Sequence, residues 1–130
     1  MTPELHMLVY ASLLSIVLAF PPLVALILDR GLAYAGGNRD EDIELPAWGG
    51  RAQRAQWNLL ANLPAFAALV LAAAVVGISN ENTAWGAQQF FWARVAHAVI
   101  YIAGIPYLRA VAFIASLGGL FDIARELLSA

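Results

Sequence analysis

Residues 5–28 read LHMLVYASLLSIVLAFPPLVALIL, and this run contains no Asp, Glu, Lys or Arg. As an α-helix it is about 36 Å long, which is enough to cross the hydrocarbon core of a bilayer. Pro21 and Pro22 lack a backbone N–H, so they should kink this helix or begin a new turn. The run therefore predicts a first membrane-spanning helix that is interrupted at its two prolines.

The composition of the whole chain is also typical of a membrane protein. Hydrophobic residues make up 62% of the 130 residues and charged residues 12%, against roughly 25% charged residues in a soluble protein. The basic residues are seven scattered Arg, so no basic stripe exists for a nucleic-acid backbone, and we exclude nucleic-acid binding. Because the chain has no Cys, it has no thiolate metal site, and any thiol chemistry must use the thiol of a ligand.

Three more apolar stretches follow the first one. They cover residues 55–78, 84–104 and 107–128, and they are separated by the polar turn 79–83 and by the break Gly104–Pro106. Residues 29–53 carry Gly, Pro and most of the charge, so they should form one long loop. The sequence predicts a single all-α domain over residues 1–130, an integral membrane four-helix up-and-down bundle.

The distribution of Arg predicts the orientation of this bundle. The N-terminus and the 79–83 turn contain no Arg or Lys, whereas four Arg flank or lie in the long loop: Arg30, Arg39, Arg51 and Arg54. The positive-inside rule therefore places loop 29–53 in the cytoplasm and both termini outside. The acidic run Asp40–Glu44 lacks the glycine and the downstream glutamate of a calcium loop, so we expect a solvated loop and no metal site.

The third stretch contains polar residues that lipid does not tolerate. Arg94 lies near its middle, and His97 and Tyr101 follow three and seven residues later. This spacing puts the three side chains along one helical face, where they could line a polar pocket. An Arg that reaches towards the membrane surface beside an incidentally buried His is the alternative interpretation.

A second polar stripe opens the stretch that follows the loop. Arg51, Arg54, Asn58 and Asn62 are spaced three, four and four residues apart, and Gln56 lies off this line near the same end. Two Arg at a membrane boundary commonly only anchor a helix. However, Arg109, just past the Gly104–Pro106 break, should lie on the same cytoplasmic side.

Cationic and hydrogen-bonding groups thus converge at one end of a thin bundle, which favours an anionic ligand held by arginine forks. The carboxylates around the spans all fall near predicted span ends, and they are Glu4, Asp29, Glu81, Asp122 and Glu126. The absence of a carboxylate deeper in the membrane argues against proton-coupled export of a cationic substrate. Two broad polar faces also predict subunit contacts that cover them.

Two motifs carry a resemblance to a known family. The sequence RAQRAQWNLLANLPAF (51–66) and the sequence RVAHAVIYIAGIPYLR (94–109) resemble the MAPEG family, the membrane-associated proteins in eicosanoid and glutathione metabolism, in its bacterial branch. The resemblance covers nearly the whole chain. It implies a homotrimer of four-helix subunits in the bacterial inner membrane, with glutathione bound as co-substrate between adjacent subunits near the cytosolic face.

The resemblance also assigns roles to individual residues. It implies that Arg109 is the catalytic residue that stabilises the glutathione thiolate, since a guanidinium in a low dielectric favours the charged sulfur. It implies that glutathione is held by residues of the second and third helices, with Arg30 matching an arginine that reaches a glutathione carboxylate. Together with the two polar stripes, the predicted binding residues are Arg30, Arg51, Arg54, Gln56, Asn58, Asn62, Arg94, His97 and Tyr101.

Two positions depart from the family pattern. Ala61 stands where the family usually has a glutamate that pairs with the glutathione amino group, and Phe113 stands where some members have a tyrosine.

The predicted function is a glutathione-dependent transferase or peroxidase acting on a small lipophilic electrophile that arrives through membrane lipid. The alternatives are a non-catalytic trimeric membrane protein that binds an anionic or lipid ligand in the same cleft, and a structural protein without a ligand.

Overall fold

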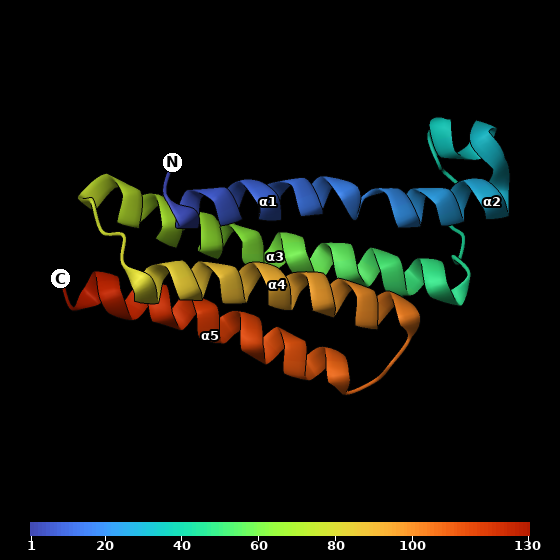
Figure 1. The fold of residues 1–130 in the computed structure, drawn as a ribbon. Helices are drawn as coiled ribbons and strands as arrows, with labels where there is room; N and C mark the ends of the chain where they lie inside the picture. The colour runs from blue at the N-terminus through green and yellow to red at the C-terminus, as the bar shows by residue number, and fades with distance from the viewer.

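The computed structural model describes residues 1–130, and all its regular elements are helices. The all-α class predicted from the sequence is therefore confirmed. The helices are α1 (Pro3–Val17), α2 (Phe20–Gly36), α3 (Ala47–Val76), α4 (Glu81–Ala103) and α5 (Leu108–Leu128). α1 and α2 follow each other in one row, and α3, α4 and α5 lie alongside them (Figure 1). Both chain termini lie at the same end of the molecule (Figure 1).

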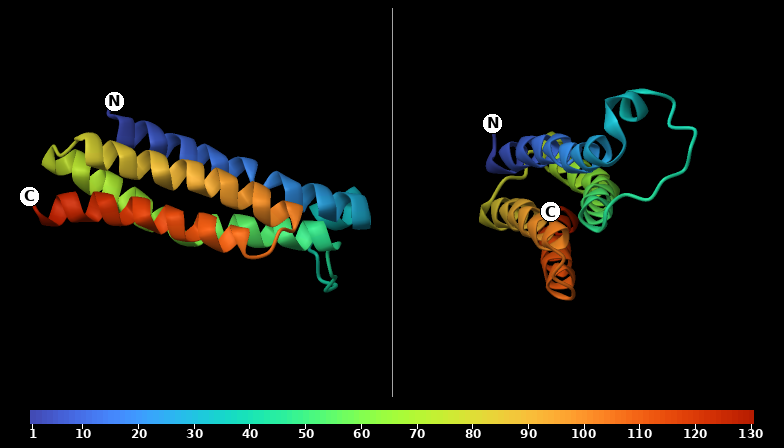
Figure 2. Two further views of the ribbon diagram at one scale, coloured as in Figure 1. Left: turned by 60° about the horizontal axis from the view of Figure 1, so that its bottom comes forward. Right: turned by 90° about the vertical axis from the view of Figure 1, so that its right-hand side faces the viewer.

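The first row is broken where the two prolines occur. α1 ends at Val17, and α2 begins at Phe20 with Pro21 in its first turn, a position where no backbone donor is needed. The prediction that these prolines begin a new turn is confirmed. A second break lies at Gly31, whose φ of 84° is not helical. The chain beyond Gly31 and through residues 37–46 swings away from the other helices (Figure 2).

The helices extend beyond the predicted spans around the long loop. Helix α2 continues, across its break at Gly31, to Gly36 and α3 already begins at Ala47, so the continuous non-helical part of the predicted loop 29–53 is residues 37–46. The predicted limits were placed where formal charge begins. Arginine is nevertheless a good helix former, so Arg51 and Arg54 precede the predicted apolar stretch but lie inside α3.

The other boundaries follow local signals in the sequence. Helix α3 ends at Gly77 and α4 ends at Gly104, both with a left-handed backbone that glycine adopts without strain. Asn80 and Thr83 form a reciprocal capping box at the start of α4. The turn 79–83 and the Gly104–Pro106 break thus separate the helices as predicted.

The helices pack through a core of aromatic and small side chains. Phe66 of α3 stacks on Phe90 of α4 with ring centres 4.1 Å apart, and both are fully buried. Helices α4 and α5 approach closely at Gly86 and Gly119, where a Cβ on Gly119 would lie only 2.4 Å from the Gly86 carbonyl oxygen. These two glycines therefore allow the close contact between α4 and α5.

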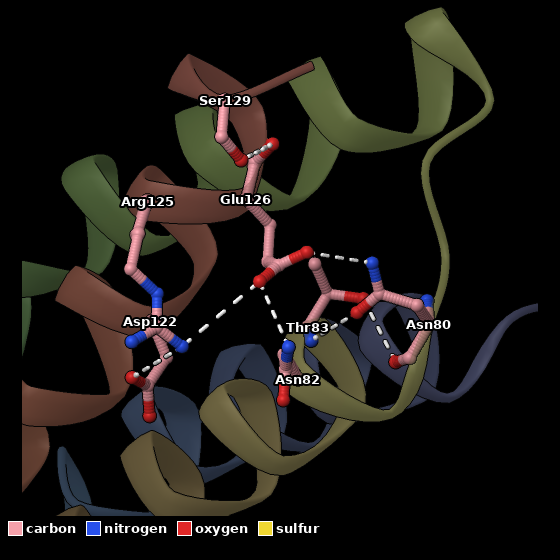
Figure 3. A network of polar contacts seen from close by, with 7 residues as sticks. All are labelled: Asn80, Asn82, Thr83, Asp122, Arg125, Glu126 and Ser129. Carbon is pink, nitrogen blue, oxygen red and sulfur yellow. Dashed lines mark hydrogen bonds and ion pairs between the residues drawn. The ribbon is translucent and has the colours of Figure 1, made fainter.

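A polar network joins the start of α4 to the end of α5 (Figure 3). The Glu126 carboxylate accepts hydrogen bonds from the side-chain amides of Asn80 at 2.9 Å and Asn82 at 2.8 Å. Arg125 lies 3.9 Å from the same carboxylate. The last turn of α5 is thereby attached to the cap of α4.

The N-terminus is held at the same end by Glu4. This carboxylate is 2% exposed and accepts hydrogen bonds from the Thr83 hydroxyl at 2.5 Å and from the Ser79 hydroxyl at 3.0 Å. Glu4 therefore links α1 to the turn between α3 and α4. Buried carboxylates need such donors, because unpaired burial costs several kcal/mol by typical scales.

The outer surface of the chain is apolar. Large side chains such as Leu28, Val75 and Phe121 are more than two-thirds exposed. Two helical segments, Pro3–Gly36 and Ala47–Val76, are long and apolar enough to cross a membrane by length and composition. An apolar surface of this extent is what lipid or other subunits cover.

Candidate ligand-binding site

A pocket of about 230 Å³ opens between α3, α4 and α5. It includes four of the residues predicted from the sequence, one from α3, two from α4 and one from α5. The lining residues are Asn58, His97, Tyr101, Arg109, Ala110 and Phe113.

Helical spacing and the break after α4 explain this convergence. His97 and Tyr101 lie four residues apart on one face of α4, and Arg109 and Phe113 are related in the same way on α5. Gly104, with φ of 81°, turns the chain so that the first turn of α5 lies beside the last turn of α4. The two polar faces therefore meet at one end of the helices.

Two guanidinium groups lie against the Tyr101 ring. The guanidinium carbon of Arg109 is 4.2 Å from the ring centre and that of Arg54 is 5.9 Å from it. The His97 ring meets the Tyr101 ring edge-on, with centres 5.5 Å apart. Cation–π contacts of this kind are worth about 0.5–2 kcal/mol and orient the cation more than they neutralise it.

Arg94 is buried behind the pocket wall and has incomplete hydrogen bonding. It is 1% exposed, and its Nη2 donates a hydrogen bond of 2.6 Å to Oδ1 of Asn58. Its Nε and Nη1 have no partner, and neither does Nδ1 of His97, which is 3% exposed. Because Arg94 is buried and bonded inwards, the alternative that it reaches towards the membrane surface is wrong.

No carboxylate balances the charge of this site. The ion pairs in the chain are those of Arg30 with Asp29 at 3.4 Å and of Arg125 with Asp122 and Glu126. The three other guanidinium groups near the pocket, those of Arg54, Arg94 and Arg109, form none. The region is therefore cationic, and its unpaired buried donors are the kind that an anionic oxygen satisfies.

Two predicted binding residues take part in local contacts instead. Nε of Arg51 donates a hydrogen bond of 3.2 Å to the Ile102 carbonyl near the end of α4. The Asn62 amide donates one of 2.8 Å to the Asn58 carbonyl in its own helix. Arg51 thus satisfies a carbonyl that the helix end leaves open, and Asn62 supports Asn58.

Two more predicted residues do not line this pocket. Arg30 lies on α2 and pairs with Asp29. Gln56 lines a different pocket of about 410 Å³, which is formed by α2, the 37–46 loop and α3. Within one chain the predicted set is therefore divided between two sides of α3.

Sequence reasoning missed two lining residues of the first pocket. Ala110 carries no polar signal in the sequence, and Phe113 stands out there only by its lack of a hydroxyl. The spacing of four residues from Arg109 could have identified Phe113 as a neighbour on the same face. The second pocket had no comparable signal, because it depends on the path of the chain after Gly31.

Long apolar helices with exposed apolar side chains are typical of an integral membrane protein. The model of the MAPEG family matches residues 6–126, and the chain belongs to this family. Comparison with curated proteins and with solved structures gave no match. The family predicted from the two motifs is confirmed.

Proposed function

We propose that this protein is a membrane-embedded glutathione-dependent transferase or peroxidase of the bacterial branch of its family, acting on lipophilic electrophiles. Membership of the MAPEG family suggests a glutathione-related function. The observation that carries the proposal is the convergence of Asn58, His97, Tyr101 and Arg109 on one pocket, with buried Arg94 bonded to Asn58.

Arg109 is the residue that would act on the reacting sulfur. A free thiol has a pKa of about 8.5, and a guanidinium in a site of low dielectric lowers the pKa by favouring the thiolate. In a transfer reaction the thiolate sulfur attacks an electrophilic carbon, a C–S bond forms, and the leaving group departs with its bonding electrons. The protein supplies charge and position, and the peptide supplies the sulfur.

The remaining cationic groups would hold the two carboxylates of glutathione. Arg54 and Arg94 have no acidic partner in the chain, and guanidinium groups bind carboxylates in bidentate geometry. Ala110 and Phe113 give the pocket an apolar side. Val111 and Ile114 on the same helix are more than half exposed, so α5 offers a lipophilic electrophile an apolar approach from the bilayer.

The assembly we propose is a homotrimer of up-and-down four-helix subunits with the ligand between adjacent copies. In support, Arg30 and Gln56 lie away from the first pocket within one chain, and a neighbouring copy would bring such residues to it. Exposed apolar side chains along the helices leave surface for subunit and lipid contacts. The proposed location is the bacterial inner membrane, with the 29–53 loop in the cytoplasm.

Titration of the purified protein in lipid nanodiscs with glutathione tests this function. We expect the ultraviolet absorbance of a thiolate to appear at neutral pH, and conjugation of 1-chloro-2,4-dinitrobenzene to depend on Arg109. Arg125→Leu is the control, because Arg125 is exposed and pairs with Asp122 and Glu126 outside the pocket. Binding without thiolate absorbance and without conjugation would reject the enzyme.

A second candidate is a non-catalytic trimer that binds an anionic or lipid ligand in the same cleft. It is favoured by Ala61, which provides no carboxylate for an amino group, and by Phe113, which lines the pocket without a hydroxyl. This candidate predicts tight binding of anions with no turnover of any electrophile.

A further inference from the structure

The turn between α4 and α5 contains two residues with a positive φ. Gly104 has a φ of 81° directly after α4, and Tyr107 has a φ of 67° directly before α5. Glycine adopts such a conformation freely, whereas a tyrosine is strained there and stays in it only where the surrounding structure holds it. Arg109 follows Tyr107 by two residues. The conformation of this turn therefore sets the position of Arg109.

Arg51 contacts this turn from the second turn of α3. The Ile102 carbonyl near the end of α4 has no helical donor, because the residue four positions later is Pro106, which has no N–H. Nε of Arg51 donates to this carbonyl at 3.2 Å. A Cβ on Gly104 would lie 3.1 Å from both Nε and Cζ of Arg51, so the guanidinium fills the space that the glycine leaves open. A cation at this end also complements the helix dipole of α4.

Arg51 itself lies outside the ligand pocket. It is absent from the residues that line the pocket, and it forms no ion pair. The two groups on either side of the turn, Tyr101 and Arg109, do line it. Arg51 is thus connected to the pocket through the backbone of the turn that joins these two residues.

The geometry points to Arg51 as a positioning residue, which holds the turn 104–107 so that Arg109 stays over the Tyr101 ring and which does not bind the ligand. The effect on a thiol rests on the proposed function, because it acts through Arg109. The hold on the turn rests only on the contacts of Arg51 with the Ile102 carbonyl and Gly104.

Removal of the guanidinium tests this role on the bound thiol. In Arg51→Leu in lipid nanodiscs we expect the pKa of bound glutathione to rise, so that the thiolate fraction at neutral pH falls at least about threefold, within the range of one cation–π contact. The dissociation constant of glutathione should change less than about threefold. Arg125→Leu, at an exposed position outside the pocket, should change neither value. An unchanged thiol pKa in Arg51→Leu overturns the inference, whether or not affinity falls.

A double variant separates positioning from a direct effect of the Arg51 charge. If Arg51 acts through Arg109, Arg51→Leu should not raise the thiol pKa further in an Arg109→Leu protein. A further rise as large as that in the Arg109 wild type would mean that the Arg51 charge acts on the sulfur directly, which overturns the inference.

A glycine variant displaces the guanidinium and keeps its charge. In Gly104→Ala the new methyl group would lie 3.1 Å from Arg51, and we expect a raised thiol pKa. Gly77→Ala is the matched control, because Gly77 ends α3 with a φ of 76° and nothing lies within 4 Å of a Cβ there. Both variants put a side chain at a left-handed helix end. Equal thiol pKa values in the two variants would contradict the role of the Arg51 contact.

Hydrogen exchange without a ligand separates this inference from the proposed function. The N–H groups of Ala110 and Val111 both donate to the Tyr107 carbonyl, and their exchange should be several-fold faster in Arg51→Leu than in wild type or Arg125→Leu. If glutathione forms no thiolate in the wild type, the proposed function fails; faster exchange then still supports the hold on the turn, and unchanged exchange overturns it. If wild type and Arg51→Leu bind glutathione with the same thiol pKa, only the inference fails.

Discussion

The guanidinium of Arg109 lies over the face of the Tyr101 ring, with 4.2 Å between its carbon and the ring centre. These residues come from different helices, α5 and α4, and the left-handed Gly104 between them lets the helices fold back on each other. The Tyr101 ring also meets His97 edge-on. The Tyr101 ring therefore lies in contact with both His97 and Arg109, the residue proposed to stabilise the thiolate.

Removal of the Arg109 charge should raise the pKa of the bound thiol. In Arg109→Leu we expect this pKa to return towards about 8.5, and each unit of increase lowers the thiolate fraction at neutral pH roughly tenfold. The measurement is thiolate absorbance and turnover against pH at saturating glutathione, with the oligomeric state compared separately with that of the wild type. Equal rates for variant and wild type at neutral pH would remove Arg109 from the mechanism.

The Tyr101 ring, rather than its hydroxyl, should position Arg109. Tyr101→Phe keeps the aromatic face and therefore the contact with Arg109, which is worth roughly 0.5–2 kcal/mol. We expect the pKa of the bound thiol to be unchanged and turnover to stay within about threefold of wild type. Tyr101→Leu loses the face and should lose roughly tenfold in turnover by the same energy scale. If the Phe variant falls as far as the Leu variant, the hydroxyl itself takes part.

Much of the fold follows from local properties of the sequence. Apolar stretches long enough for a membrane, a proline pair, and glycines at helix ends predict the helices and the break after Val17. The helix limits near the loop could not be predicted from polarity, because polarity marks where a membrane span ends and not where helical hydrogen bonding ends. Helix α3 accordingly begins at Ala47, eight residues before the predicted span.

The site was predictable where one helix face carries several polar residues. The spacing of His97 and Tyr101 predicted that both side chains line one pocket, whereas the separation of Gln56 from Asn58 depends on rotation about α3. Two residues of helix correspond to about 200°, so these side chains point to opposite sides. Contacts between helices, such as Arg94 with Asn58, require the packing angle and cannot be derived from spacing alone.

The contact between α4 and α5 should not tolerate a methyl group. In Gly119→Ala the new Cβ would lie 2.4 Å from the Gly86 carbonyl oxygen, and overpacking of this kind typically costs about 1–3 kcal/mol. We expect a lower midpoint of thermal unfolding in nanodiscs. Gly36→Ala is the matched control, because nothing lies within 4 Å of a Cβ there; equal midpoints for the two variants would contradict the close packing.

The orientation in the membrane is tested with reporter fusions. Four Arg flank or lie in the predicted 29–53 loop, so the loop should face the cytoplasm and the C-terminus the outside. A reporter that works only outside the cytoplasm should be active when fused after Ala130. A reporter that works only in the cytoplasm should be active when inserted at Asn38. Asn38 is an exposed residue of the non-helical loop, which makes insertion tolerable. A cytoplasmic signal from the Ala130 fusion would reverse the assignment.

Restoring an acid at position 61 should strengthen glutathione binding. Ala61 lies about one turn beyond Asn58 on α3, so Ala61→Glu gives the glutathione ammonium a charged partner. Such bonds are worth roughly 1.5–3 kcal/mol, on the order of 10- to 150-fold in dissociation constant. Ala61→Gln is the neutral control. Unchanged glutathione affinity in Ala61→Glu protein with the oligomeric state of the wild type would show that glutathione does not place its amino group there.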